Sequence, residues 1–266
     1  MVKRIFITML LLAGVCLARV QAADSDPYRQ SYLAAEQAFV QNDFDTALRR
    51  LDAAEQLQPG TAMVLNLRGA VYVRLKKYDE AQKVFANLHR QDPDNMMALF
   101  NLGETYFLQK DYAGALKYFQ SFVEKNPAQK SLGVYKVFLC ELMTGRDPAA
   151  KSILAKTAAT PDNPLYFYLN AAWQFKLGQP ADARGYLQSA FQIYSGQVNA
   201  AYVDSLIELG YVKTGDLKTA SGSAAPAVAN ESSAPDQTAP DTATPDLSGL
   251  DRLLPSLDAP AKDKKK

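Results

Sequence analysis

Apolar residues recur with helical spacing along residues 28–212, and short polar breaks interrupt them. Breaks rich in Gly, Asn, Asp or Pro mark turns between helices. Asp43, Asp79 and Asp111 follow such breaks, where a carboxylate caps the free N–H groups at a helix start. The pattern predicts helices over residues 28–41, 44–57, 61–75, 78–91, 95–109, 112–125, 129–143, 147–158, 163–177, 180–194 and 197–212.

One set of residues occurs twice in succession between Ala62 and Pro127. Leu65, Gly69, Tyr72, Ala81, Phe85 and Pro93 are followed, 34 residues later, by Leu99, Gly103, Tyr106, Ala115, Phe119 and Pro127. The same register, extended both ways, predicts five units over 28–61, 62–95, 96–129, 130–163 and 164–197. Helices that cross closely need small residues at the contact, so Gly69 and Gly103 are predicted to be packing positions. Gly114 is predicted to lie on the exposed side of its helix.

These residues resemble the tetratricopeptide repeat, a helix–turn–helix unit with a small residue, Tyr, Ala, Phe and Pro at fixed positions. The unit 130–163 departs from the family pattern at Gly133, Lys136, Val137 and Cys140, and the position of Lys136 usually holds leucine. The resemblance implies an all-α fold, a right-handed α-solenoid of about five helix-turn-helix repeats over residues 28–214. A half-polar helix over residues 198–212 is expected to cap it.

The composition changes after Thr214. Residues 219–246 are almost all Ala, Ser, Thr, Pro, Asp, Gln, Asn and Gly, which cannot bury enough apolar surface to offset the entropy of ordering. We therefore expect a disordered tail over residues 215–266, with a leucine-rich segment at 246–258. Its leucines are Leu247, Leu250, Leu253, Leu254 and Leu257, and the lysines Lys262, Lys264, Lys265 and Lys266 follow. Self-docking of this leucine segment in the molecule's own groove is one hypothesis, and contact with an external partner is the other.

Residues 1–22 have the features of an export signal. Lys3 and Arg4 precede an apolar run, and Val20-Gln21-Ala22 places small side chains where a signal peptidase requires them. The run is too short for a comfortable membrane span. We predict cleavage after Ala22, a short polar lead over residues 23–27, and a location in the periplasm or cell envelope. A lipoprotein through Cys16, an uncleaved anchor and a secreted protein are the alternatives.

Charge and candidate chemistry exclude several function classes. The 29 Lys and Arg balance 28 Asp and Glu, so no bulk charge draws the chain to nucleic acid. His89 is the only histidine, which excludes a multi-histidine metal site and weakens any Ser/His or Cys/His mechanism. Cys140 occupies an inward helix position, where we expect a buried, inert thiol. We therefore expect no enzyme, no metal and no cofactor.

The resemblance places positions two, five, nine and twelve of each unit on a concave inner surface. The residues there are mostly aromatic or Met, and we expect part of them to pack against neighbouring helices. The others are expected to form a groove for a peptide or helix, with Met supplying adaptable contacts. The candidate groove residues are Tyr32, Phe39, Met63, Asn66, Met97, Phe100, Glu104, Phe107, Phe138, Tyr168 and Phe175.

The family members that clamp the carboxylate of chaperone tails use Lys and Asn on this surface. Asn66 and Asn101 are present, but no lysines stand at the matching inner positions, so this role is not expected.

The expected function is a non-catalytic protein–protein interaction scaffold of the cell envelope. Two alternatives stay open. One is a periplasmic assembly or secretion accessory factor that docks on a membrane machine. The other is a structural repeat domain whose C-terminal tail carries the interaction. In each case the partner is a protein or peptide, with no nucleic acid and no direct membrane span after signal cleavage.

Overall fold

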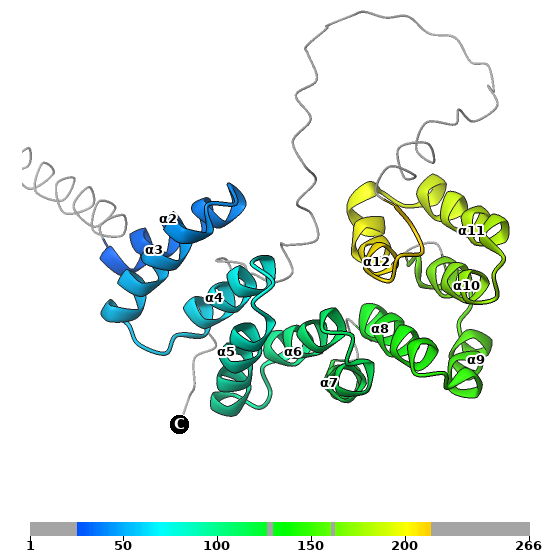
Figure 1. The fold of residues 1–266 in the computed structure, drawn as a ribbon, viewed down its shortest axis with the longest axis horizontal. Coiled ribbons are helices and arrows are strands. Elements are labelled where there is room, and N and C mark those ends of the chain that lie inside the picture. Colours follow the sequence, from blue (N-terminus) through cyan, green and yellow to red (C-terminus); the bar gives the residue numbers. More distant parts are fainter. Residues whose placement is uncertain (1–25, 127–129, 161–162, 214–266) are drawn as a thin grey trace, which may run out of the picture. The chain divides into compact units, whose positions relative to one another are not determined.

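The computed structural model describes residues 26–126, 130–160 and 163–213 (Figure 1). Its helices are α2 (Pro27–Val40), α3 (Phe44–Leu57), α4 (Ala62–Arg74), α5 (Tyr78–Gln91), α6 (Met96–Leu108), α7 (Tyr112–Lys125), α8 (Lys130–Met143), α9 (Asp147–Lys156), α10 (Leu165–Lys176), α11 (Pro180–Ile193) and α12 (Gly196–Glu208). The described part of the chain contains no strand beyond an isolated bridge between Thr160 and Asn163. The predicted all-α stack of paired helices is confirmed, and each helix end lies within four residues of its predicted position.

Polar side chains fix several helix starts. Asp43 and Asp111 each accept a hydrogen bond from the backbone N–H three residues later, that of Thr46 at 3.1 Å and that of Gly114 at 2.9 Å. Asp26 does the same for α2 at 3.0 Å, which starts that helix one residue earlier than predicted. Asp79 is different, because it lies in the first turn of α5 and the N-cap position belongs to Lys77.

The turns inside the helix pairs share one backbone feature. Asn42, Lys76 and Lys110, each 34 residues apart, have positive φ angles of 60, 57 and 64°. Gly145 and Gly178 have φ angles of 73 and 72° in the turns of the next two pairs. A left-handed residue of this kind ends a helix, so the repeat extends to the backbone of each turn.

Two compact units divide the described residues, with the boundary between Ala98 and Leu99 inside α6. Unit 1 comprises residues 26–98, in which α2 packs on α3, α4 on α5, and α4 contacts both α2 and α3. Gly69 confirms its predicted packing role, because a Cβ atom there would lie 2.4 Å from the ring of Phe85. The core of unit 1 includes Tyr32, Ala35, Phe39, Ala47, Leu51, Leu67, Ala81 and Phe85.

Unit 2 comprises residues 99–213, in which α7 packs on α8, α8 on α9 and α10, and α10 on α11. Helix α12 contacts α8, α10 and α11. A Cβ atom on Gly103 would lie 2.6 Å from the ring of Phe119, as the packing role requires. The prediction for Gly114 is wrong, since a Cβ atom there would lie 2.6 Å from the Asp111 carboxylate and 2.7 Å from the ring of Tyr106.

Several predicted segments lie outside the described residues: the export signal at 1–22, most of the polar lead at 23–27, and the disordered tail at 215–266 with its leucine-rich segment at 246–258. In the ranges that the structure does describe, no helix has both the length and the apolar character needed to cross a bilayer.

Candidate functional site

The predicted groove residues of unit 1 divide into buried and half-buried side chains. Tyr32 and Phe39 are 1% exposed and Asn66 is 2% exposed, so they belong to the interior. Met63 on α4 and Met97 at the start of α6 remain half-buried. They occupy the same position in consecutive repeats. Of the predicted groove residues in this unit, the two methionines are the ones that reach solvent.

Arg74, at the end of α4, covers the ring of Phe39. Its guanidinium carbon lies 5.7 Å from the centroid of Phe39 and 5.4 Å from that of Phe44, within the range of a cation–π contact. The Arg74 side chain also donates a hydrogen bond to the side chain of Asn42, the left-handed residue of the first turn. Arg74 thus connects the second repeat to the turn of the first.

The predicted groove residues of unit 2 mostly pack within it. Phe107, Phe138 and Tyr168 are at most 2% exposed. Phe100 is half-buried, and its ring makes edge contacts with Phe119 and Phe122 at centroid distances of 5.5 and 5.2 Å. These rings fill the space between helices, as was expected for part of the inner-surface residues.

A cluster of three tyrosines lies where α12 covers α8 and α10. Tyr135 of α8, Tyr168 of α10 and Tyr202 of α12 lie with ring centroids 5.1 to 6.0 Å apart. The Tyr168 hydroxyl donates to Oδ1 of Asn199 on α12 at 3.0 Å. Helix α12 therefore covers the first helices of two repeats in unit 2. Tyr135 and Tyr202 were not predicted as site residues.

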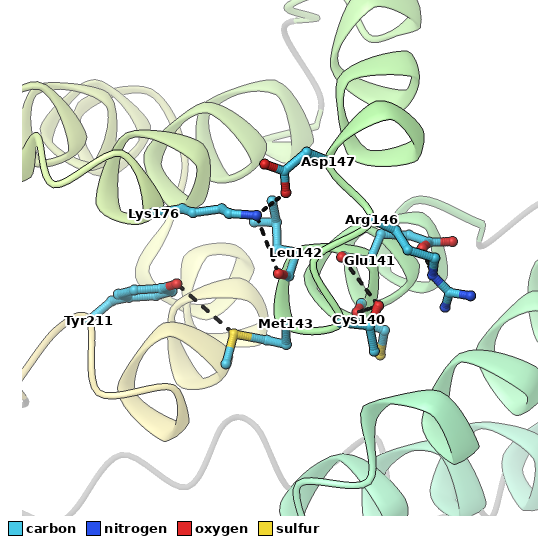
Figure 2. A network of polar contacts seen from close by, with 9 residues as sticks. Cys140, Glu141, Leu142, Met143, Arg146, Asp147, Lys176 and Tyr211 are labelled. Atoms are coloured by element: carbon cyan, nitrogen blue, oxygen red, sulfur yellow. Dashed lines mark hydrogen bonds and ion pairs between the residues drawn. The ribbon is translucent and has the colours of Figure 1, made fainter.

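The chain after α12 is fixed at a second point (Figure 2). The ring of Tyr211 stacks on Phe175 at 5.3 Å with an interplanar angle of 6°, and its hydroxyl lies 4.0 Å from Sδ of Met143. Lys176 pairs with Asp147 next to this contact, as Figure 2 shows. The predicted groove residue Phe175 is thus covered on one face by the chain itself.

Glu104 has an ion-pair partner that was not predicted from the sequence. Nζ of Lys136 on α8 lies 2.7 Å from Oε1 and 2.8 Å from Oε2 of Glu104 on α6, and 4.7 Å from the ring centroid of Phe107. The Lys136 residue is only 3% exposed. Burial by itself would lower the pKa of Lys136, but the attraction of Glu104 and Glu208 outweighs burial and raises it. The signal in the sequence was a lysine at a position where the family usually has leucine.

A second carboxylate, that of Glu208 at the end of α12, belongs to the same neighbourhood. Burial raises the pKa of Glu208 to about 7, and repulsion from Glu104 and Asp204 adds to the rise while Lys136 opposes it. The side chain nevertheless keeps substantial exposed surface.

Catalytic chemistry finds no support here. Cys140 is fully buried, and burial raises the pKa of its thiol to about 12, which confirms the expected inert thiol. Among the described residues, no group of three or more His, Cys, Asp or Glu is placed to hold a metal ion.

Solved structures share this fold at low sequence identity. MamA is 18% identical with a TM-score of 0.50, over 63% of this chain and 91% of that one. A tetratricopeptide repeat protein from Parabacteroides merdae is 17% identical with a TM-score of 0.56, over 77% and 87%. PilW, a widely conserved type IV pilus biogenesis factor, is 20% identical with a TM-score of 0.53, over 74% and 90%. At these identities the likeness shows the fold alone.

The sequence comparison identifies the repeats themselves. No curated protein matches the chain. Residues 32–81 and 68–130 match the tetratricopeptide repeat family, whose members are non-catalytic scaffolds. The matched residues include the two units that carry the 34-residue pattern, and the paired helices continue through α11. Residues 32–130 therefore match tetratricopeptide repeats, and a stack of such repeats implies a scaffold for protein–protein interaction.

Proposed function

We propose that this protein is an interaction scaffold of the cell envelope that binds a peptide or helix of a protein partner on the first helices of unit 1. The observation that carries the proposal is the pair Met63 and Met97. They hold one position in consecutive repeats and keep exposed surface, whereas Tyr32, Phe39 and Asn66 are buried. Methionine adapts its shape to apolar partners, which suits a surface that receives a peptide side chain.

The first helices α8 and α10 of unit 2 are less suited to this role. Tyr202 covers Tyr135 and Tyr168, and Tyr211 covers one face of Phe175. A partner would have to displace α12 to reach Tyr135 and Tyr168, and Tyr211 to reach the covered face of Phe175. The proposed location in the envelope is supported by the sequence of residues 1–22, and a chain beginning at Ala23 in the native host would agree with it.

Site-specific photo-cross-linking in the native host tests the binding surface. A photoreactive side chain at position 63 or 97 should give a cross-linked protein of defined mass. The same side chain at Lys83, an exposed position of α5, serves as the control. Equal cross-linking from position 83, or none from 63 and 97, would contradict the proposed surface.

The same measurement bears on the two alternatives. A cross-linked component of a membrane machine would support the assembly or secretion factor. If the partner is captured only from positions in the 246–258 segment, the tail carries the interaction instead.

A further inference from the structure

The repeat places an acidic and a basic side chain at equivalent positions of the two units. Glu36 on α2 precedes Glu104 on α6 by 68 residues, which is two repeat lengths. Arg68 on α4 precedes Lys136 on α8 by the same number. In unit 2 these charges pair, with Nζ of Lys136 2.7 Å from Oε1 of Glu104. Helices α2 and α4 also contact each other, so the repeat leads us to expect a Glu36–Arg68 pair in unit 1.

Arg68 has a different partner in the structure. Its Nη1 atom lies 2.6 Å from Oδ1 of Asp52 on α3 and donates a hydrogen bond to it. Unit 2 has Gln120 at the position equivalent to Asp52, so no carboxylate competes there for Lys136. Because Asp52 engages Arg68, Glu36 forms no ion pair within the described residues.

The surroundings of Glu36 lack a positive charge. Glu36 is half-buried, and burial raises the pKa of its carboxyl. An adjacent cation would lower this pKa, and no basic side chain of the described chain does so.

A buried phenol oxygen lies next to this carboxylate. Tyr32 precedes Glu36 by one turn of α2 and is 1% exposed. Its hydroxyl is near enough to oppose the rise of the Glu36 pKa, but the Oη atom makes no hydrogen bond of normal geometry. A buried polar atom without a partner is uncommon and points to a missing donor or acceptor. The carboxylate and the phenol oxygen together suit a positively charged donor.

We propose that Glu36 binds the ammonium or guanidinium group of a basic side chain in the peptide that occupies the unit 1 surface, and that Asp52 keeps Glu36 open by engaging Arg68. An ammonium group donates three hydrogen bonds, enough for the Glu36 carboxylate and for Oη of Tyr32. Glu36 and Met63 both keep exposed surface on the contacting helices α2 and α4. The peptide therefore carries Lys or Arg near an apolar residue.

This inference rests on the proposed function, because it names a chemical feature of the peptide that binds at Met63 and Met97. Selection from a library of short random peptides displayed on phage tests the two separately. The targets are the full-length wild type, Glu36→Gln, and a chain with Met63→Ser and Met97→Ser. Glu80→Gln, which removes an exposed carboxylate of α5, is the matched control.

The wild type and Glu80→Gln should enrich peptides that have Lys or Arg at a fixed spacing from an apolar residue. Glu36→Gln should enrich the same apolar residue without the basic one. Peptides with no preferred basic position, or with an equal preference on Glu36→Gln, would overturn this inference alone. If the wild type enriches no peptide, or the double methionine variant enriches the same peptides, the proposed function fails and the inference fails with it.

Calorimetric titration with one selected peptide tests the pairing and the role of Asp52. Replacing the basic residue of the peptide by Gln should weaken binding to the wild type by about tenfold and leave binding to Glu36→Gln unchanged. Asp52→Asn frees Arg68 to pair with Glu36, so it should weaken binding of the basic peptide by a similar factor. The double change Asp52→Asn with Arg68→Gln should restore the affinity.

Two results of this titration would contradict the proposal. Equal losses for the wild type and Glu36→Gln would show that the basic residue binds elsewhere. Undiminished affinity in Asp52→Asn would show that Asp52 does not keep Glu36 open.

Discussion

Lys136 of α8 points its ammonium group at the carboxylate of Glu104 on α6, with Nζ 2.7 Å from Oε1. The pair joins the first helices of consecutive repeats at a position where an apolar contact is usual. The side chains are 4% and 18% exposed, so little water screens the charges. Buried pairs of this kind add little net stability over an apolar pair, but each charge needs the other.

Removing one charge of the pair should therefore lower the free energy of unfolding more than replacing both charges with apolar side chains. We expect Lys136→Ala to lower the free energy of unfolding by up to about 3 kcal/mol, because Glu104, whose side chain is only 18% exposed, loses its counter-charge. The double change Glu104→Leu with Lys136→Leu should be within about 1 kcal/mol of the wild type or more stable. Denaturant unfolding measures both.

An exposed ion pair offers the matched control. Nη1 of Arg68 lies 2.6 Å from Oδ1 of Asp52, but the Asp52 side chain is 61% exposed. Asp52→Ala should cost about 1 kcal/mol or less. Equal losses for Asp52→Ala and Lys136→Ala would show that burial of the Lys136 pair has no energetic consequence.

Close packing of Gly103 gives a second prediction. A Cβ atom at this position would lie 2.6 Å from the ring of Phe119, which is fully buried. Gly103→Ala should therefore destabilise unit 2 by roughly 1–3 kcal/mol, measured by thermal or denaturant unfolding.

Gly185 on α11 is the control for this substitution, because a Cβ atom there would meet nothing within 4 Å. Gly185→Ala should stabilise the protein by about 0.4–1 kcal/mol through its effect on the unfolded chain. Gly114, once expected to be exposed, cannot serve as the control because of its contacts with Asp111 and Tyr106. A neutral Gly103→Ala would mean that Phe119 has room to move.

The raised pKa of Glu208 predicts how the stability of the folded protein changes with pH. Its pKa rises from 4.5 to about 7 in the folded protein, so the folded state holds this proton more tightly than the unfolded state. The contribution of Glu208 to stability is thus fully present below pH 4.5 and is lost as the pH rises to about 7. Lys136, Glu104 and Asp204 act on the same titration.

Glu208→Gln removes this titration and isolates its contribution. The variant should gain stability relative to the wild type as the pH rises from 5 to 7.5, and the melting temperatures of the two proteins across this range measure the gain. A constant difference between them would contradict the raised pKa.

The helices and the packing glycines were predictable because they depend on local spacing. Gly69 and Gly103 recur at the 34-residue offset, and each faces the Phe located sixteen residues later. The Glu104–Lys136 pair was not predictable, since the sequence shows an unusual lysine but not which carboxylate faces it. The same holds for Tyr135 of α8 and Tyr202 of α12, because the sequence does not show that these two rings meet at a centroid distance of 5.2 Å.

The last prediction uses Cys140 as a reporter of unit 2. Cys140 is 0% exposed, so a labelling reagent cannot reach its sulfur in the folded protein. Burial also raises its thiol pKa to about 12, so little of the reactive thiolate is present at pH 8. In a chain with Cys16 changed to Ser, Cys140 is the only thiol. We expect labelling at pH 8 to be at least about a thousandfold slower in buffer than in denaturant, because the reaction requires α8 to open.

A thiol placed at the exposed position Ser152 on α9, in a chain that also carries Cys140→Ala, should react at once in buffer. If Cys140 reacts as fast as this control, α8 is not held by its neighbours. If Tyr202→Ala accelerates labelling of Cys140 while α5 keeps its hydrogen-exchange protection, α12 is part of what holds α8 in place.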